Sequence, residues 1–446
     1  MQSKPLILEK EVKSLIGEDK EPDIVFFTPT LDVENYIRHV LECGYEGLEK
    51  VIKDDNNDVK TAMIIPIDSG STDTTRDVIN KFIGETNGNR RGIETRLIDY
   101  TQLSGYKERF EEGFRGKGIA WELMFYLVAN HLKSKINYSL DSDLISIDKL
   151  WVPNAYDKSN QEKSNLLLYT YSRHKYDGSI TNILKSLLKQ TIRKKHVPNQ
   201  IIGGDIVFDY RVAEHMSKSD IWGSDVGKDA SQYGTDIFVT QTSIFEDMNI
   251  AEIFSGKKEH GSTSKYGEDE KFLPRMARQV FNVSFYLTGK YKDKWIGVLP
   301  LSENDHDGQY PIIDNVEVKK VKVDQEKLRD SFLPYLDNGH GEFLNQHLSE
   351  GTYKHIVDAH NDSLYLSHDA RADLWTEIAA LYHTLEEDKR KELLDVAAYS
   401  VYGMSHYSHV RDVRYLDLKR AEKKVINFGQ KFVERQPYFK KLMLKK

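Results

Sequence analysis

The sequence predicts an α/β fold in which helices cover both faces of a mostly parallel sheet, followed by an all-helical domain. Short apolar runs of strand length alternate with helical stretches over about 150 residues after residue 22, and this alternation is typical of parallel sheets. From about residue 310 strand signals become scarce and helical periodicity dominates. We therefore expect an N-terminal helical extension at 1–22, an α/β domain at 23–310 and a helical domain at 311–446.

The expected strands are compact apolar runs, as buried strands of parallel sheets usually are. They are placed at 24–29, 62–67, 94–98, 137–140, 166–171 and 251–254. Helical periodicity predicts helices at 33–41, 74–83 and 119–132, and in the last domain at 325–333, 370–386 and 389–402. Residues 100–116 show little periodicity and contain three glycines, so we expect a loop there.

The composition is that of a globular protein and excludes several classes. Of 446 residues, 39% are hydrophobic and 30% are charged, and the net charge of −7 makes nucleic acid a poor candidate partner. No run of 18 apolar residues and no signal-peptide core occurs, so we expect neither a membrane span nor export. The single cysteine, Cys43, fits a reducing compartment, and we expect a cytoplasmic protein.

The strongest chemical signal is Asp141-Ser142-Asp143, which follows the expected strand at 137–140. At a strand end two such carboxylates can converge on one ion, and oxygen-rich sites suit Mg²⁺ or Mn²⁺, which also bind diphosphate oxygens. Open α/β sheets bind ligands beyond the carboxyl ends of their strands, so the location suits a nucleoside diphosphate. A solvated turn with an Asx cap explains the same residues without any ligand.

Two other expected strands end in residues of similar kind. Asp68 and Ser69 open the segment 68–73, where a carboxylate can accept hydrogen bonds from a base or ribose, although the segment also caps the next helix. Pro29 ends the first expected strand, and Asp32 follows it.

Three short motifs can bring backbone or charge close to a ligand. Gly116-Lys117-Gly118 opens a helix, where the lysine can meet a phosphate, although this is not a Walker A loop. Gly203-Gly204-Asp205 suits either close approach of a ligand or a tight turn. Asp236 lies in the first turn of an apolar helix, where stabilisation of the helix dipole is the simpler explanation.

Two basic residues complete the candidates. His260 is one of fifteen histidines, and nothing in its local sequence marks it as a ligand rather than a structural or exposed residue. Arg173 follows the expected strand at 166–171 and is a candidate for binding an anion, with a surface ion pair as the alternative.

The order of these motifs resembles that of the GT-A glycosyltransferases that make mannosylglycerate, glucosylglycerate and glucosyl-3-phosphoglycerate. The resemblance extends from about residue 24 to residue 287 and is far more specific than any single motif. It matches, in sequence order, the nucleotide-binding turn at 68–73, the lysine turn at 116–118, the metal-binding Asp-x-Asp at 141–143, the arginine and threonine of the acceptor region at 173 and 181, the Gly-Gly-acid at 203–205, the Tyr-Gly-x-acid at 233–236 and the metal-binding histidine at 260.

The resemblance also implies a role for each matched residue. Asp143 and His260, with Asp141, are implied to bind a divalent cation, Mg²⁺ or Mn²⁺. The residues implied to bind the nucleotide sugar are Pro29, Asp32, Asp68, Ser69, Lys117, Asp141, Ser142, Gly203 and Gly204. The residues implied to face the acceptor are Arg173, Thr181, Asp236 and Tyr266, with Arg173 and Asp236 taken as catalytic.

The implied activity is retaining transfer of a hexose from a GDP- or UDP-sugar to glycerate, which gives an α-linked product. Gly261-Ser262-Thr263 replaces the Arg-Asn of phosphoglycerate enzymes, and Tyr266-Gly267 resembles a mobile loop of mannosylglycerate synthase. Both departures favour glycerate, with 3-phosphoglycerate as the alternative acceptor. We also expect a homodimer, while the helical domain has no residue-level role assigned.

Three other classes of protein compete with this hypothesis. A sugar nucleotidyltransferase would carry a glycine-rich basic loop after its first strand, where this chain has Pro29-Thr30-Leu31-Asp32. A non-catalytic nucleotide-sugar-binding protein would be more attractive had Asp141, Asp143 or His260 been lost. A processive polysaccharide synthase would require membrane segments, which the sequence does not predict.

Overall fold

The computed structural model describes residues 6–17, 20–88, 92–172, 174–176, 178–192, 197–261, 272–297, 325–361 and 365–444. Its internal contacts divide the chain into two compact units. The first unit comprises 1–171 and 202–265, and the second comprises 172–201 and 266–446. The second unit is therefore formed by two separate segments, and the segment 172–201 interrupts the first unit.

The first unit is built on an eight-stranded sheet. Its strands are β1 (Ile24–Thr30), β2 (Ala62–Asp68), β3 (Ile93–Thr95), β4 (Ile98–Asp99), β5 (Ile136–Ser139), β6 (Leu166–Ser172), β7 (Ile206–Asp209) and β8 (Ile250–Lys257). The order is β3-β2-β1-β5-β7-β6-β8, and β4 also pairs with β2. Pairs among β1 to β5 are parallel, whereas β7 runs antiparallel to both β5 and β6.

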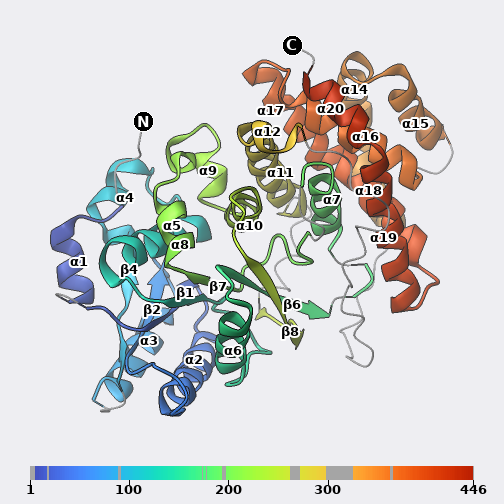
Figure 1. Cartoon of the computed structure of the whole chain (residues 1–446). Coiled ribbons are helices and arrows are strands. Elements are labelled where there is room, and N and C mark those ends of the chain that lie inside the picture. Colours follow the sequence, from blue (N-terminus) through green and yellow to red (C-terminus); the bar gives the residue numbers. More distant parts are fainter. Residues whose placement is uncertain are drawn as a thin grey trace. The chain divides into compact units, whose positions relative to one another are not determined.

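Helices cover both faces of this sheet (Figure 1). On one side lie α2 (Ile37–Lys53), α3 (Thr75–Thr86) and α6 (Trp151–Glu162), and on the other lie α5 (Lys117–Leu127) and α8 (Tyr210–Ser217). The remaining helices of this unit are α1 (Glu9–Ile16), α4 (Ser104–Arg109), α9 (Gly227–Ala230), α10 (Thr235–Phe245) and the short turns η1 (Tyr100–Gln102), η2 (Val128–Leu132) and η3 (Asp220–Gly223).

The apolar strands form the core between these layers. Phe26, Ile64 and Tyr138 of three adjacent strands are fully buried and belong to one cluster with side chains of α2 and α6. On the other face Phe125 of α5 packs edge-on against Phe208 of β7, with ring centroids 5.2 Å apart. Burial on both faces explains why these strands read as continuous apolar runs.

The described residues of the second unit form helices. They are α7 (Ser179–Leu188), α11 (Phe272–Lys290), α12 (Lys292–Trp295), α13 (Gln325–Tyr335), α14 (Gly341–His347), α15 (Glu350–Asn361), α16 (His368–Leu381), α17 (Glu387–Asp395), α18 (Tyr402–Val413), α19 (Leu418–Glu434) and α20 (Gln436–Leu444), with π-helical turns η6 (Leu336–His340) and η7 (Val396–Val401). In the part of the chain described here, no helix combines the length and apolar character needed to cross a membrane.

The expected α/β class, mostly parallel sheet and C-terminal helical region are confirmed. The expected domain boundary at residue 310 does not match the division into units, because α7 and α11 pack with the helices of the second unit. Within the expected extension at 1–22, α1 contacts the first unit, since Glu11 accepts hydrogen bonds from the backbone and hydroxyl of Ser104.

The structure differs from the sequence prediction at residues 100–116 and at β7. Residues 100–116 were expected to form a loop, but they contain η1 and α4. An aromatic row orders them, since Tyr100, Tyr106, Phe110 and Phe114 stack in sequence with centroids 5.0–5.5 Å apart. The strand β7 was not expected, because four residues are too few for a periodic signal.

A buried ion pair ties two helices of the second unit together. Asp412 of α18 contacts the guanidinium of Arg371 in α16, and their side chains are only 8% and 2% exposed. Asp412 also accepts hydrogen bonds from Tyr365 at 2.8 Å and His368 at 3.1 Å. Burial opposes the charge of Asp412, but these partners outweigh it and lower the pKa of Asp412 to about 2.

We predict that Asp412→Asn destabilises the protein by about 3–5 kcal/mol at pH 7, because it leaves the Arg371 charge buried and uncompensated. The folded-state pKa lies below the unfolded value of about 3.9, so the stabilisation is present above that value and is lost as the pH falls through about 2. Urea unfolding at several pH values measures both effects.

Asp388→Asn is the matched control, since the side chain of Asp388 is 100% exposed. Its unfolding free energy should change by less than about 0.5 kcal/mol. Equal effects of the two substitutions would contradict a stabilising role for the buried pair.

Candidate functional site

The carboxyl ends of the parallel strands bring the predicted acids to one edge of the sheet. Asp68 is the last residue of β2, and Asp141 follows the end of β5 by two residues. Because β1 pairs with both strands in parallel, these ends meet at the same edge. This is the edge at which open α/β sheets bind their ligands.

Two lysines and two aspartates form an ion network at this edge. Lys117 Nζ lies 2.7 Å from Asp141 Oδ1, and Lys258 Nζ lies 2.7 Å from Asp141 Oδ2. Lys258 Nζ also lies 2.5 Å from Asp205 Oδ2. Both oxygens of Asp141 are therefore taken by ammonium groups.

Asp205 anchors the network to the backbone. Its second oxygen accepts a hydrogen bond from the backbone N–H of Asp141 at 2.9 Å, and the Tyr171 hydroxyl donates to Asp205 Oδ2 at 2.8 Å. Asp205 is only 1% exposed. The network is thus tied to β5, β6 and the start of β7.

Close packing of two glycines fixes Lys117, the first residue of α5. A Cβ atom on Gly116 would lie 2.1 Å from the carbonyl oxygen of Ser231, and one on Gly118 would lie 2.1 Å from that of Ala230. Both distances are far shorter than any real contact, so only glycine lets α5 start this close to residues 230–231. The Gly-Lys-Gly motif therefore acts by positioning the lysine against this segment.

Gly204 completes the environment of Lys117. Its carbonyl oxygen accepts a hydrogen bond from Lys117 Nζ at 3.1 Å, and a Cβ at this position would lie 2.0 Å from the same nitrogen. The neighbouring Gly203 is also buried. The absence of side chains here leaves the space that the ammonium group occupies.

The charges in this network shift each other's titration. Burial disfavours the charge of Asp141, but Lys117 and Lys258 outweigh it and hold the pKa of Asp141 well below its usual range. Burial likewise opposes the lysine charges, but Asp141 and its neighbouring acids raise the pKa of both lysines. Asp141 and both lysines are therefore ionised at neutral pH.

Asp236 in the first turn of α10 titrates differently. Its Oδ1 lies 3.6 Å from Lys117 Nζ, which is too long for a hydrogen bond, and no hydrogen bond to this buried oxygen is found among the described residues. Burial, and to a smaller extent the charge of Asp141, raise the pKa of Asp236 to about 6 against the attraction of Lys117. Asp236 is thus a carboxylate that can take up a proton near neutral pH.

Asp143 and His260 lie side by side, and each is two residues along the chain from a member of this network. Asp143 Oδ2 is 3.7 Å from His260 Nδ1, and the two side chains are 15% and 20% exposed. The backbones of their segments pair, since Leu144 and His260 form an antiparallel bridge and Gly261 N–H donates to the Asp143 carbonyl at 2.9 Å. Residues 117 positions apart in the sequence are thereby held together.

The Asp143 and His260 pair fits a divalent cation. Two atoms each about 2.1 Å from one ion are at most ~4.2 Å apart, and 3.7 Å is within that limit. No group of three or more His, Cys, Asp or Glu side chains is placed to hold a metal among the described residues. Asp141 does not join the pair in this structure, because both of its oxygens are bound to lysines.

The residues expected at the nucleotide turn are mainly bonded to one another. Asp68 is fully buried and accepts hydrogen bonds from the backbone and hydroxyl of Ser71 at 2.9 and 2.5 Å. Asp32, which has a left-handed φ of 49°, accepts from the backbone N–H of Thr72 at 2.7 Å. Pro29 is part of β1, and Ser69 N–H donates to Thr30. These bonds shape the turn itself.

The remaining candidates are distributed unevenly. Ser142 is buried between the two acids of its motif. Thr181 lies on α7 of the second unit. Arg173 and Tyr266 lie outside the described residues.

Sequence reasoning missed Lys258, whose ammonium group contacts both Asp141 and Asp205. It follows Lys257, the last residue of β8, whose side chain is 46% exposed and pairs with Glu259 at 2.8 Å. Adjacent side chains near a strand end face opposite ways, so one lysine of the pair points inward. The sequence alone does not tell which one.

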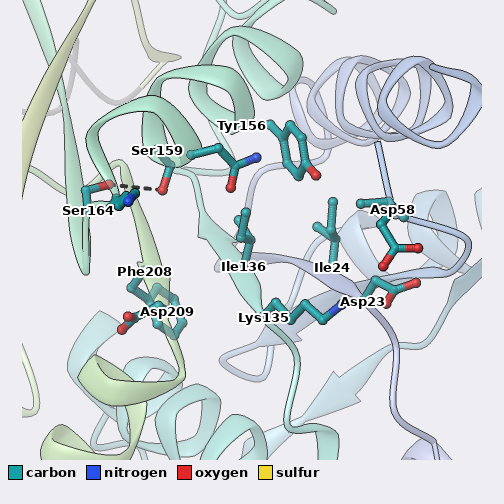
Figure 2. A pocket seen from close by; sticks show the side chains of 13 residues that line it. Asp23, Ile24, Asp58, Lys135, Ile136, Tyr156, Ser159, Ser164, Phe208 and Asp209 are labelled. Atoms are coloured by element: carbon teal, nitrogen blue, oxygen red, sulfur yellow. Dashed lines mark hydrogen bonds and ion pairs between the residues drawn. The ribbon is translucent and has the colours of Figure 1, made fainter. Parts of the chain in front are cut away.

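A separate cavity of about 370 Å³ lies at the opposite edge of the sheet, where β1 and β5 begin (Figure 2). Ile24 and Ile136 form part of its wall, and several of its polar groups are bonded to one another or to the backbone. Ser159 bonds to Ser164 at 3.0 Å, and Asp209 caps α8 through the N–H of Val212. These bonds have a structural role, and we do not assign the cavity to the site.

We predict that Gly118→Ala destabilises the fold by about 1–3 kcal/mol or more, because the added methyl group would overlap the carbonyl of Ala230. Gly84→Ala in α3 is the matched control, since nothing lies within 4 Å of a Cβ there. The control should be neutral or stabilising by up to about 1 kcal/mol. Thermal unfolding of the three proteins measures the difference, and equal melting temperatures would contradict this account of the motif.

The sequence matches no protein-family model and no curated protein. Similar solved structures include glucosyl-3-phosphoglycerate synthase from Mycobacterium tuberculosis with Mn²⁺, UDP and glucosyl-3-phosphoglycerate, at 20% identity and a TM-score of 0.41. Complexes of the same enzyme with Mn²⁺, UDP-glucose and phosphoglyceric acid, and with Mg²⁺ and UDP, match at 19% identity and a TM-score of 0.41. Each alignment covers 60% of this chain and 80% of the other.

Proposed function

We propose that this protein is a metal-dependent hexosyltransferase that uses a nucleoside diphosphate sugar as donor. The observation that carries the proposal is the pairing of Asp143 with His260, each of which lies two residues along the chain from a member of the ion network, Asp141 and Lys258 respectively. A cation pair and two fixed ammonium groups on the same segments suit a diphosphate, which is both a metal ligand and an anion. The order of motifs that resembles GT-A enzymes supports the same activity.

Asp143 and His260 are the residues that would hold Mg²⁺ or Mn²⁺. Magnesium usually binds through one or two carboxylates together with substrate phosphates, so two protein ligands are enough for such a site. When bound, the cation supplies Lewis-acid stabilisation of the charge that develops on the departing nucleoside diphosphate.

The lysines add a second source of stabilisation. Lys117 and Lys258 are held in place by Asp141 before any ligand binds, so little reorganisation is needed when negative charge develops nearby. Asp68, Ser69 and the neighbouring turn are the proposed contacts of the base or ribose.

We propose glycerate as the acceptor and 3-phosphoglycerate as the alternative. Asp236, with one buried oxygen that has no hydrogen-bond donor among the described residues, is suited to orient an acceptor hydroxyl. Arg173, Thr181 and Tyr266 remain proposed acceptor contacts on the basis of the sequence motifs. An arginine would bind the carboxylate through two parallel hydrogen bonds.

Retention of configuration is part of the proposal and rests on the motif resemblance. No side chain of the described site is assigned as a covalent nucleophile. Departure of the diphosphate on the face that the acceptor hydroxyl attacks would need none, with positioning and electrostatics supplying the rate enhancement.

The proposal predicts sugar transfer in a direct assay. The protein is incubated with GDP- or UDP-hexoses, Mg²⁺ or Mn²⁺, and glycerate or 3-phosphoglycerate, and nucleotide release is compared with product mass. We expect release that depends on the acceptor, and an α-linked product by nuclear magnetic resonance. Formation of a sugar nucleotide from a sugar phosphate and a nucleoside triphosphate would instead identify a nucleotidyltransferase.

Asp143→Ala should reduce turnover on the order of 10³-fold or more, because the cation loses a ligand. Chelation by EDTA should abolish activity, and added Mn²⁺ should restore it. Asp157→Ala is the control, since Asp157 is an exposed residue of α6. Unchanged turnover in both the variant and the chelated protein would remove the metal from the mechanism.

Asp236→Asn should reduce kcat/KM by about 10²-fold or more, since an amide accepts the hydroxyl hydrogen bond poorly. In the wild type, kcat/KM should rise with pH through about 6, because Asp236 loses its proton there and the carboxylate is a stronger acceptor than the neutral carboxyl group. The variant should lack this rise. A wild-type profile that is flat between pH 5 and 7 would contradict the assigned role.

A further inference from the structure

We infer that Asp141 is a positioning residue, which holds Lys117 and Lys258 for the donor's diphosphate and leaves the cation to Asp143 and His260. This inference rests on the proposed function and refines its site. It divides the two acids of the Asp-Ser-Asp motif between different tasks. One acid carries the cation, and the other carries two ammonium groups.

The contacts of Asp141 support this division. Its two oxygens lie 2.7 Å from Lys117 and 2.7 Å from Lys258, so each ammonium group occupies a different oxygen. Each oxygen of Asp141 is already in contact with a lysine ammonium group. A divalent cation bound to the same oxygen would therefore lie close to that positive charge. Like charges at such short range repel strongly in a partly buried site, whereas Asp143 Oδ2 and His260 Nδ1, 3.7 Å apart, are at a separation that one ion can bridge.

Each lysine keeps a donor for a ligand. An ammonium group has three hydrogens. Lys117 uses one on Asp141 and one on the carbonyl of Gly204, while Lys258 uses one on Asp141 and one on Asp205. Within the described residues no further hydrogen bond is made by either nitrogen. One N–H of each lysine is thus available to a phosphate oxygen.

Holding the lysines beforehand favours binding of an anion. A lysine side chain that is ordered only upon binding loses up to about 2 kcal/mol of rotamer entropy. Asp141 orders both side chains in advance, and Gly204 leaves the space in which Lys117 stands. The geometry therefore points to two preorganised N–H donors next to a cation site.

Two binding measurements separate the tasks of the two acids. Mn²⁺ binding is followed by electron paramagnetic resonance, and binding of inorganic pyrophosphate with Mn²⁺ present is followed by calorimetry. We compare the wild type with Asp141→Asn, Asp143→Asn and Lys258→Met. Thermal unfolding checks that each variant is folded.

Asp143→Asn should weaken Mn²⁺ binding by about tenfold or more, whereas Asp141→Asn and Lys258→Met should change it by less than about threefold. Asp141→Asn and Lys258→Met should each weaken pyrophosphate binding by about tenfold, as expected from the loss of one charge-assisted hydrogen bond. The double variant Asp141→Asn/Lys258→Met should bind pyrophosphate little more weakly than either single variant, because both substitutions disrupt the same Asp141–Lys258 contact.

The sign of the Asp141→Asn effect distinguishes positioning from simple charge. Removal of a negative charge alone would tighten binding of an anion, whereas loss of lysine positioning weakens it. Asp236→Asn serves as the charge control, since its oxygen is 3.6 Å from Lys117 and makes no hydrogen bond to it. This variant should bind pyrophosphate at least as tightly as the wild type.

Lys258→Arg should restore much of the pyrophosphate affinity lost in Lys258→Met, because it keeps a cation between the two acids. Equal loss of Mn²⁺ binding in Asp141→Asn and Asp143→Asn would overturn the inference and leave the proposed function intact. Tighter or unchanged pyrophosphate binding by Asp141→Asn would also overturn it. A wild-type protein that binds neither Mn²⁺ nor pyrophosphate would instead contradict the proposed function itself.

Discussion

The candidate site depends on one partly buried set of ion pairs, in which Asp141 and Asp205 share Lys258 and Asp141 also binds Lys117. Taking four charges out of water is unfavourable unless each finds its partners. Here the hydroxyl of Tyr171, the carbonyl of Gly204 and the backbone N–H of Asp141 complete the set. The glycines at 116, 118 and 204 exist to let the backbone and the lysine come this close. Removing Lys258 would leave Asp205 without its cation, and removing Asp141 would leave Lys117 without its closest acid.

This interaction also explains why two neighbouring acids behave so differently. Asp141 is in hydrogen-bond contact with two ammonium groups, which hold its pKa well below the usual range. Asp236 has one buried oxygen with no hydrogen bond among the described residues, and Lys117 Nζ lies 3.6 Å from it. Burial therefore raises the pKa of Asp236 to about 6, because this single, more distant lysine does not offset it.

Much of the fold and part of the site follow from the sequence, because strand ends of a parallel sheet share an edge. That rule brings Asp68 and Asp141 together and directs attention to the motif that contains Asp143. The nearness of His260 to Asp143 depends on pairing between segments 117 residues apart, which local sequence does not specify; it was expected only from the order of the motifs.

Lys258 was missed because Lys257 beside it is chemically identical. Asp205 precedes its strand whereas Asp141 follows its strand, and they meet only because β7 runs antiparallel to β5. Strand direction of this kind is a long-range property, and so is the assignment of α7 and α11 to the helical unit.

The span of these contacts has a consequence for how the molecule reaches its native state. Asp141 and Lys258 are separated by 117 residues, and β6, β7 and β8 all form from the chain between them. Loops of that length close late, since their entropy must be overcome before the contact contributes any stability. We therefore expect the ion network to be among the last parts of the first unit to form. Before β8 joins the sheet, Asp141 and Asp205 would lack Lys258, the cation that they share. Binding of a diphosphate would then require that the first unit has completed its folding.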